Sequence, residues 1–155
     1  MLKAVGLVLV FTFSMVIGTR LSELEKKKRQ ACRELVTVIE YLSNEIPRRR
    51  MLNDIIADVC NRNKYLRASA KKELADAVKC VLTGSGTAEI VERTEAFLEG
   101  LGRGVDVLSE RDACISFLEY MKPLCEALEA ESTRRSEVYS RLGALCGLIL
   151  CILVL

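Results

Sequence analysis

The side chains that could do chemistry in this chain of 155 residues are carboxylates, hydroxyls and thiols, because histidine is absent. Without histidine the chain lacks the commonest general base, the Ser–His and Cys–His nucleophile pairs and the usual zinc ligand sets. The carboxylates stand among Lys and Arg. Glu23 with Lys27 and Glu25 with Arg29 are i, i+4 pairs that support a helix. We expect no enzyme, and therefore no catalytic residue, metal or cofactor.

The glycines and the thiols do not indicate a reactive site either. Residues 83–87 (TGSGT) contain two glycines, but no Gly-Lys-Ser/Thr follows, so a P-loop is excluded and a turn between helices is expected. The seven cysteines are odd in number and have no CxxC spacing. They lie on or beside apolar stripes or in the apolar tail, where a thiol behaves as a small hydrophobe. We expect free thiols in a reducing compartment.

The charge and the aromatic content argue against a nucleic-acid partner. The net charge is only +2, aromatic residues make up 5% of the chain and Trp is absent. Nucleic-acid binding usually needs a basic field and often needs stacking side chains. We therefore expect no nucleic acid and no small-molecule substrate, and look instead at what the apolar segments could position.

The N-terminal segment has the composition of a membrane anchor. Residues 4–19 are uncharged and mostly aliphatic, between Lys3 and Arg20. At ~1.5 Å per residue they extend roughly 24 Å, somewhat less than a ~30 Å hydrocarbon layer, and the two long basic side chains can reach the headgroups. We predict an anchor over residues 1–19. The alternative is a cleaved signal peptide, with Lys3 as its charged region and Gly18 near the cut.

The C-terminal segment predicts a second anchor. Residues 142–155 (LGALCGLILCILVL) carry no charge, and Tyr139 and Arg141 precede them as interfacial residues. The length alone also fits a buried core helix. However, the segment is apolar on every face, and a small domain has no room to surround it.

Basic residues flank both predicted anchors on the side of the middle region. They are Lys26, Lys27, Lys28 and Arg29 after the first anchor, and Arg134, Arg135 and Arg141 before the second. An excess of Lys and Arg beside a membrane segment marks the cytoplasmic side, so residues 20–141 are expected in the cytosol. The run at residues 26–29 either marks this topology or binds anionic lipid headgroups.

The middle region has a helical period throughout, which predicts an all-α fold, an antiparallel helical bundle. Its apolar stripes are Leu21, Leu24, Ala31, Leu35, Val38 and Leu42; then Leu52, Ile55, Ile56, Val59 and Cys60; then Leu66, Ala70, Leu74, Ala77, Val78 and Val81; then Ile90, Thr94, Phe97, Leu98 and Leu101; and last Cys114, Leu118, Met121, Cys125 and Leu128. Pro47 is expected to end the first helix and Pro123 to kink the last, which continues through Tyr139 into the tail. Residues 109–112 (SERD) have the pattern of a capping box.

These features together resemble the stage III sporulation protein AB family. The resemblance lies in an N-terminal anchor opening MLK, a long charged helix and a C-terminal anchor. It is strongest in Leu101-Gly102, in residues 109–112 and in the run YSRLGALCG at residues 139–147. The family's second Leu-Gly is replaced here by Val105-Asp106, and the turn is a residue longer in this chain than in the family.

The resemblance implies a scaffold in the channel between mother cell and forespore. The family is similar to the cytoplasmic helical domains of the type II secretion inner-membrane platform protein. The implied location is the mother-cell membrane facing the forespore. The implied partners are the other stage III sporulation complex proteins, a cytosolic secretion-type ATPase among them, together with membrane lipids. For the partner interface we predict the turn residues Leu101, Gly102, Asp106, Ser109, Arg111 and Asp112.

A different class of protein remains open from the sequence. A secreted or periplasmic helical protein would have a cleaved signal ending near Thr19, a buried C-terminal helix and oxidised thiols.

Overall fold

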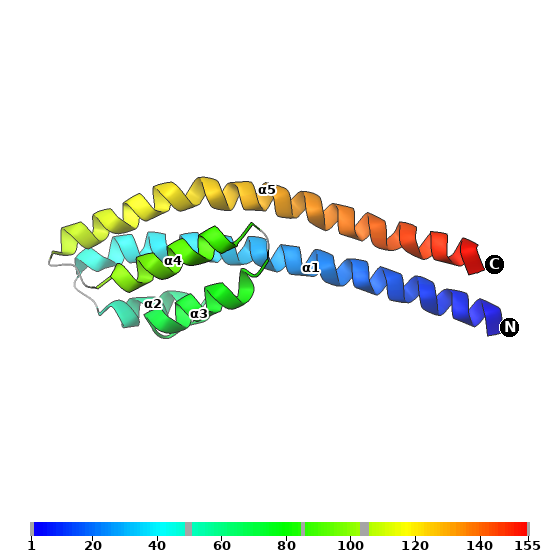
Figure 1. Cartoon of the computed structure of the whole chain (residues 1–155). Coiled ribbons are helices and arrows are strands. Elements are labelled where there is room, and N and C mark those ends of the chain that lie inside the picture. Colours follow the sequence, from blue (N-terminus) through cyan, green and yellow to red (C-terminus); the bar gives the residue numbers. More distant parts are fainter. Residues whose placement is uncertain (1, 49–50, 85, 103–105, 155) are drawn as a thin grey trace. The chain divides into compact units, whose positions relative to one another are not determined.

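A computed structural model describes residues 2–48, 51–84, 86–102 and 106–154. Within these residues all regular structure is helical (Figure 1). The α-helices are α1 (Leu2–Glu45), α2 (Leu52–Cys60), α3 (Lys71–Val81), α4 (Ala88–Gly100) and α5 (Val107–Val154), and a short 3₁₀ helix, Ile46–Arg48, follows α1. The predicted all-α class is confirmed, as is the continuation of the last helix through Tyr139 into the tail.

The chain divides into two compact units that share its two long helices. Met1–Lys27 and Glu129–Leu155 form one, which we call the hairpin unit; Lys28–Leu128 forms the other, which we call the core unit. The helices α1 and α5 each contribute to both. The predicted limits of the anchors, after residue 19 and before residue 142, stay predictions.

The core unit is built around one apolar cluster to which each of its helices contributes. Its fully buried side chains include Leu35, Ile39 and Leu42 of α1, Ile55 and Ile56 of α2, Leu74 and Val78 of α3, Ile90 and Leu98 of α4, and Cys114 and Met121 of α5. Together with Val59, Thr94 and Leu118, which are also buried, these residues follow the helical period, so each helix turns one stripe toward the others. Burial of the stripes stabilises the unit by the hydrophobic effect.

A carboxylate holds the irregular segment that joins α2 to α3. The buried side chain of Glu34 accepts hydrogen bonds from the backbone amides of Lys64, Tyr65 and Leu66, at 2.9 to 3.1 Å. The sequence pattern predicted a helix from Leu66 onward, and this start is wrong. Leu66 is buried, but its amide binds Glu34 instead of a helical carbonyl, and the helix begins five residues later at Lys71.

The helix ends agree with the sequence in part. The helix α1 ends at Glu45, and Pro47 lies in the 3₁₀ turn Ile46–Arg48 that follows it, so the predicted end of the helix at this proline is confirmed to within two residues. The capping box over residues 109–112 is wrong, because α5 already begins at Val107 and the amide of Glu110 donates to the carbonyl of Asp106. Ser109 is therefore inside the first turn. Pro123 lies inside α5, which continues on both sides of it.

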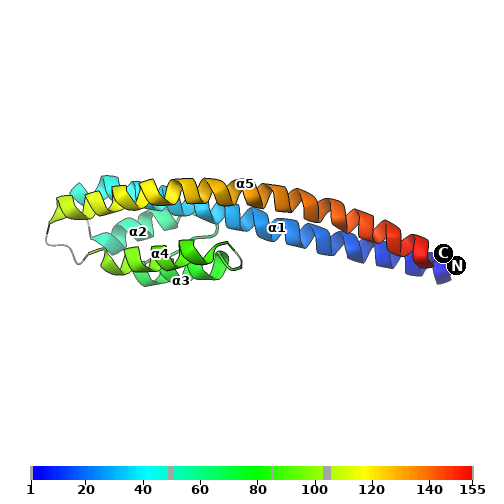
Figure 2. The same cartoon turned by 45° about the horizontal axis from the view of Figure 1, so that its top comes forward.

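The hairpin unit consists of the first part of α1 and the last part of α5, side by side and antiparallel (Figures 1 and 2). Their outer ends meet at the same end of the unit. Among the described residues, no helix has a stretch both long enough and apolar enough to cross a membrane. The two predicted transmembrane helices, at residues 1–19 and 142–155, thus gain no support here.

Candidate interaction surfaces

The two helices of the hairpin unit meet through glycines. A Cβ atom at Gly18 would lie 2.9 Å from the carbonyl oxygen of Tyr139 and 3.0 Å from the Cα of Gly143. A Cβ at Gly147 would lie 2.8 Å from the ring of Phe11. Real side chains do not approach so closely. The backbones of α1 and α5 therefore touch at Gly18 and Gly143 because neither residue carries a side chain, and Gly147 leaves room for the ring of Phe11.

Hydroxyl groups continue this contact along both helices. Ser14 donates to the carbonyl oxygen of Gly143 at 2.8 Å, and the Ser22 and Ser136 hydroxyls are 2.6 Å apart. Ser132 donates to the carbonyl oxygen of Glu25 at 2.7 Å. The inside of the hairpin unit is thus lined by small and polar groups. We call these contacts, with Gly18, Gly143 and Gly147, the small-residue seam.

The sequence predicted a different inward face for this part of α1. Leu21 and Leu24 were expected on the same apolar seam as Leu35 and Leu42, but they are 41% and 51% exposed. Ser22 and Glu25 are buried in their place. The prediction fails here because hydroxyls and glycines allow the two helices to approach more closely than leucines would.

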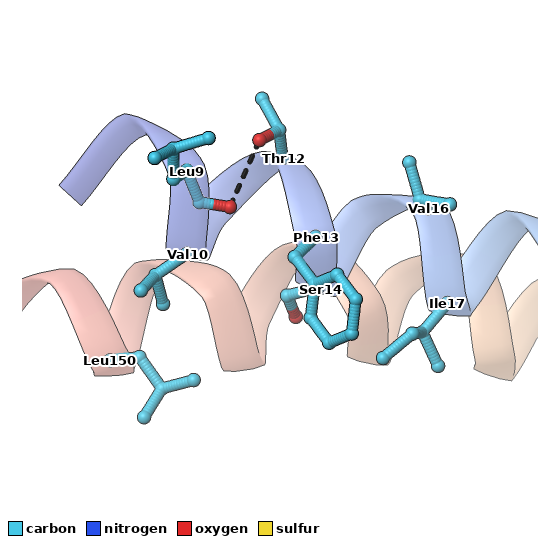
Figure 3. Close-up of a pocket in the computed structure, with 8 residues that line it drawn as sticks. All are labelled: Leu9, Val10, Thr12, Phe13, Ser14, Val16, Ile17 and Leu150. Atoms are coloured by element: carbon cyan, nitrogen blue, oxygen red, sulfur yellow. Dashed lines mark hydrogen bonds between the residues drawn. The ribbon is translucent and has the colours of Figure 1, made fainter. Parts of the chain in front are cut away.

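The outside of the hairpin unit is apolar. The exposed large side chains on it include Val8, Leu9, Val10, Phe13, Met15, Val16, Ile17, Leu142, Leu145, Leu148, Ile149, Leu150 and Ile152. Eight residues of this surface, from Leu9 to Ile17 of α1 and Leu150 of α5, line an open groove of about 700 Å³ (Figure 3). Phe13 is 69% exposed there. An apolar patch of this extent on a protein surface marks an interaction site.

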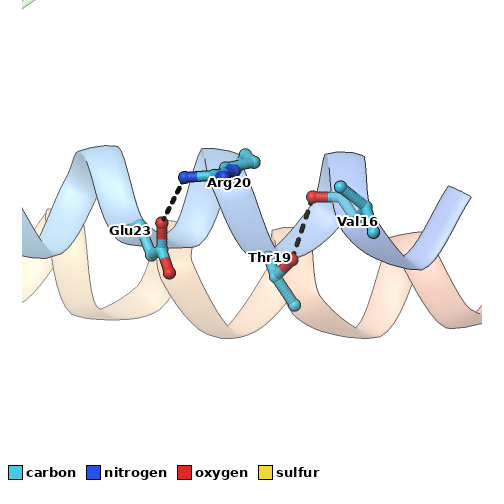
Figure 4. Close-up of polar contacts among 4 residues, drawn as sticks. All are labelled: Val16, Thr19, Arg20 and Glu23. Carbon is cyan, nitrogen blue, oxygen red and sulfur yellow. Dashed lines mark hydrogen bonds and ion pairs between the residues drawn. The ribbon is translucent and has the colours of Figure 1, made fainter. Parts of the chain in front are cut away.

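Even the hydroxyls on this outer surface are satisfied within the chain. Thr12 donates to the carbonyl oxygen of Leu9 at 3.0 Å (Figure 3) and to that of Val8 at 2.9 Å. Thr19 donates to the carbonyl oxygen of Val16 at 2.9 Å (Figure 4). Hydroxyls with internal partners do not depend on water, so this face can be surrounded by an apolar medium.

Charged side chains mark where the apolar surface ends on each helix. Arg20 forms an exposed ion pair with Glu23 at 3.5 Å (Figure 4), and Arg141 lies 3.9 Å from Glu137. Arg135 pairs with Glu131, and Arg134 is exposed beside them. Lys26 and Lys27 end the first segment of the hairpin unit, whereas Lys28 and Arg29 begin the core unit. The side chain of Lys3 lies outside the described residues.

The six turn residues predicted as a partner interface lie between α4 and the start of α5. Leu101 is buried, and its amide donates to the carbonyl oxygen of Phe97. Its own carbonyl oxygen accepts a hydrogen bond from the ammonium group of Lys71 at 2.8 Å. Gly102 has a φ of +83°, a left-handed conformation that favours glycine. Both residues therefore have a structural role at the end of α4.

The other four turn residues are exposed. Asp106 precedes α5, and Ser109, Arg111 and Asp112 lie in its first turns. Ser109 lines a groove of about 270 Å³ between α4 and α5, together with Leu101. Arg111 and Asp112 do not line this groove. The structure therefore brings Leu101 and Ser109 together at one groove and leaves the remaining residues around it.

Two buried thiols of the core unit are unreactive in character. The described cysteines are free, and burial raises the pKa of Cys60 and of Cys114 from 9.0 to about 11. The charges of Glu34 and Glu110 respectively add to these shifts. A thiol is nucleophilic only as thiolate, so both remain protonated hydrophobes at neutral pH. In the part of the chain that the structure describes, His, Cys, Asp and Glu form no group that could hold a metal ion.

The small-residue seam and the three hydrogen bonds that Glu34 accepts from residues 64–66, which we call the Glu34 clamp, were not predicted from the sequence. A signal for the seam was present, since Ser14 and Gly18, and Gly143 and Gly147, are each four residues apart. Small residues at this spacing let two helices pack closely, most often in membranes. The Glu34 clamp has no sequence signal, because its three partner amides lie some thirty residues away.

Comparison with known proteins identifies the family. No curated protein and no solved structure matches the chain. The family model of stage III sporulation protein AB (spore_III_AB) matches residues 3–155, which include both the hairpin unit and the core unit. The chain belongs to the stage III sporulation protein AB family.

Proposed function

We propose that this stage III sporulation protein is a membrane-held scaffold of the channel between mother cell and forespore. In this account the hairpin unit inserts into the mother-cell membrane that faces the forespore. The core unit lies in the cytosol and docks a secretion-type ATPase against the other proteins of the channel. Its action is mechanical, through binding and positioning.

The observation that carries the proposal is the inverted polarity of the hairpin unit. Glycines and serines such as Gly18 and Ser22 lie between its helices, while Phe13, Ile17 and their neighbours point outward. In water this arrangement would leave a large apolar surface unburied. In lipid it is favourable, because helices there associate through close packing and hydrogen bonds between small residues.

The charged border supports the orientation. Arg20 follows the apolar segment of α1 and Arg141 precedes that of α5, and both stay exposed, as residues at a headgroup layer do. In the sequence, Lys26 and Lys27 on α1 and Arg134 and Arg135 on α5 lie between the apolar segments and the core unit. An excess of basic residues beside a membrane segment favours the cytosol for the core unit. Free thiols also suit a reducing compartment.

The shared helices support a scaffold that links a membrane to a motor. Since α1 and α5 each run through both units without a break, the units are joined by two continuous helices. A load on the core unit is therefore carried to the hairpin unit through hydrogen-bonded backbone.

The role in sporulation is tested by deleting the gene in a host that forms spores. The count of heat-resistant spores should fall steeply and recover when the intact gene is restored. Co-purification from sporulating cells tests the motor: the secretion-type ATPase should be retained with the full chain. Unchanged spore counts would contradict the sporulation role, and loss of the ATPase from every preparation would contradict the docking role.

A matched pair of variants tests the membrane part. Val16→Arg places a charge on the outer face of the hairpin unit, whereas Ala127→Arg places the same charge on an exposed site of the core unit. A charge within the hydrocarbon layer costs about 2.5–3.5 kcal/mol. We expect Val16→Arg to leave the membrane fraction and to lower spore counts, and Ala127→Arg to do neither. Equal behaviour of the two variants would contradict insertion.

A further inference from the structure

The segment that joins α2 to α3 carries positive charge and no carboxylate. Residues 61–70 (NRNKYLRASA) include Arg62, Lys64 and Arg67, but neither Asp nor Glu. The side chains of these three residues are exposed. We call residues 61–70 the basic loop.

The backbone of the basic loop is held at several points of the core unit. At its start, the amides of Arg62 and Asn63 donate back to carbonyl oxygens of α2, each at 3.1 Å. The Glu34 clamp holds its middle. Further on, the backbone of Ala68 hydrogen-bonds the buried thiol of Cys60. The loop therefore displays its charged side chains from a backbone that is already ordered before any partner binds.

The fold of the loop brings its three cations into one region. The Nε of Arg67 donates to the carbonyl oxygen of Asn63 at 3.2 Å, and Asn63 stands between Arg62 and Lys64 in the chain. The ammonium group of Lys64 lies over the ring of Tyr65, 5.2 Å from its centroid. The three positive charges thus leave one short, folded piece of backbone.

The carboxylates near the loop are engaged with other groups. Glu34 is buried and accepts the loop's own amides, Glu73 accepts from the amide of Ser69 at 2.7 Å, and Asp58 accepts from the hydroxyl of Tyr41 at 3.2 Å. Within the described ranges, no ion pair joins a carboxylate to any of the three cations. Even against the one negative charge of Glu34, the loop keeps an excess of positive charge.

We propose that the basic loop binds an acidic segment of a partner protein. The inference rests on the proposed function and deepens it by naming a docking surface of the scaffold. Carboxylates of the segment face the guanidinium groups of Arg62 and Arg67, since a guanidinium binds a carboxylate through two parallel hydrogen bonds. Lys64 adds a third positive charge. Complementary charge steers the segment to the loop and sets its orientation.

The loop is less suited to an anionic membrane surface. Among the described residues, none between Met51 and Val107 is a large apolar residue with an exposed side chain. The loop therefore has nothing to insert into lipid, and three basic charges alone hold a protein to a membrane only weakly. Carboxylates on a protein segment can instead use the fixed geometry of the two guanidinium groups.

The test places a photocrosslinking amino acid at exposed Asn61 of the full chain in sporulating cells. The crosslinked molecule is then identified by mass spectrometry. We expect one peptide of a partner protein that is rich in Asp and Glu. Lipid, nucleic acid, a basic or uncharged peptide, a second copy of this chain or an absence of crosslinks would each overturn the proposal.

Charge-reversed variants decide whether the crosslink depends on the cations of the loop. Arg62→Glu with Arg67→Glu should lower the crosslink yield at least about tenfold, because attraction becomes repulsion. Lys79→Glu with Lys122→Glu makes the same change in net charge at two exposed sites of the core unit and should leave the yield unchanged. Equal yields in the two double variants would overturn the proposal. Circular dichroism checks that both keep their helices.

A charge exchange with the identified partner makes the test independent of any effect on folding. Replacement of the partner's crosslinked Asp and Glu residues by Lys should restore the crosslink to the chain that carries Arg62→Glu and Arg67→Glu. Failure to restore it would show that these charges do not meet, and would overturn the proposal.

The two proposals fail separately. If the gene deletion abolishes spores while the loop variants crosslink and sporulate as the unaltered chain does, the basic loop is not the docking surface and the sporulation role stands. If the deletion has no effect on spores but the crosslink depends on the loop, the docking surface stands and the sporulation role fails.

Discussion

The hairpin unit and the core unit use the same two helices with opposite polarity. In the core unit, α1 turns Leu35 and Leu42 inward and both are fully buried. In the hairpin unit, the same helix turns Ser22 and Glu25 inward and leaves Leu21 and Leu24 exposed. The change occurs between Glu25 and Leu35, over about three turns of an unbroken helix.

One helix can therefore bury apolar side chains in one unit and small or polar side chains in the other, and the proposed function accounts for this through the surrounding medium. Water drives apolar side chains together, so the core unit packs leucines and isoleucines between its helices. Lipid provides no such force, so in a membrane close backbone approach and hydrogen bonds hold helices together. The small-residue seam fits the second rule and the core unit fits the first.

The largest effect on stability is expected from removing a core leucine. Leu42→Ala deletes a fully buried side chain and should lower the free energy of unfolding of the core unit by about 2–5 kcal/mol. Leu24→Ala, on the outside of the hairpin unit, should change it by less than about 0.5 kcal/mol. Urea titration followed by circular dichroism measures both. Similar losses in the two variants would contradict the assignment of Leu24 to the outer face.

The reactivity of the thiols should also differ between buried and exposed positions of the two units. Cys60 and Cys114, with a pKa of about 11, should react with maleimide at pH 8 at least about a hundredfold more slowly than exposed Cys80. Exposed Cys146 of the hairpin unit should react in detergent-free denaturant but resist a water-soluble maleimide when the chain is in vesicles. Mass spectrometry of the labelled chain follows each site. Rapid labelling of Cys146 in vesicles would count against the lipid-facing surface.

The same pKa shifts give a dependence of stability on pH. Because the folded state raises the pKa of Cys60 and Cys114 above 9.0, the unfolded chain loses these protons first as pH rises. Their contribution to stability is complete below pH 9 and declines as pH rises toward about 11. Urea titrations across this range should show the decline, and Cys60→Ala with Cys114→Ala should reduce it. An undiminished slope in the double variant would assign the decline to other groups.

A smaller effect is expected from adding one methyl group to the seam. Gly18→Ala forces a carbon to within 2.9 Å of the Tyr139 carbonyl oxygen, so the hairpin helices must separate at a cost of about 1–3 kcal/mol. Gly6→Ala is the control on the same helix, because a Cβ there meets nothing within 4 Å. Disulfide trapping between cysteines introduced on the two helices measures their separation. Equal trapping in both variants would mean that the glycine contact does not set the spacing.

The smallest effect concerns a single hydrogen bond of the seam. Ser22→Ala and Ser136→Ala each remove one hydroxyl of the 2.6 Å pair. A double-mutant cycle should give a coupling energy of about 0.5–1.5 kcal/mol, the usual net value of one hydrogen bond. Thermal unfolding in lipid-like detergent measures it. Strict additivity would show that the two hydroxyls do not interact.

The buried faces could be predicted from the sequence for helices of the core unit, where an apolar stripe lies opposite a polar face. The stripes at Ile55, Val78 and Leu98 are buried as their period indicates. The prediction failed at Leu21 and Leu24, since a leucine repeat alone does not show that glycines and serines on another face of the helix will make the closer contact. It failed again at Leu66, because the carboxylate of Glu34 replaces the helical carbonyl as partner of its amide.

The candidate site could be predicted only to its neighbourhood. Leu101 and Ser109 were named from the turn they flank, and both line the groove. Phe97, Gly100 and Ala113 complete it, but their contribution depends on how α4 and α5 pack, which no local pattern encodes. Arg111 and Asp112 are exposed beside the groove, and their role stays a prediction.

The central claim, that the hairpin unit faces lipid, is tested most directly by fluorescence. The chain has no Trp, so Phe13→Trp gives a single probe on the outer face of the hairpin unit, and Ile115→Trp gives a matched probe on the core unit. In phospholipid vesicles we expect blue-shifted emission from Phe13→Trp that brominated acyl chains quench, and no such quenching for Ile115→Trp. Emission from Phe13→Trp that stays water-like and is quenched only by aqueous acrylamide would contradict the account.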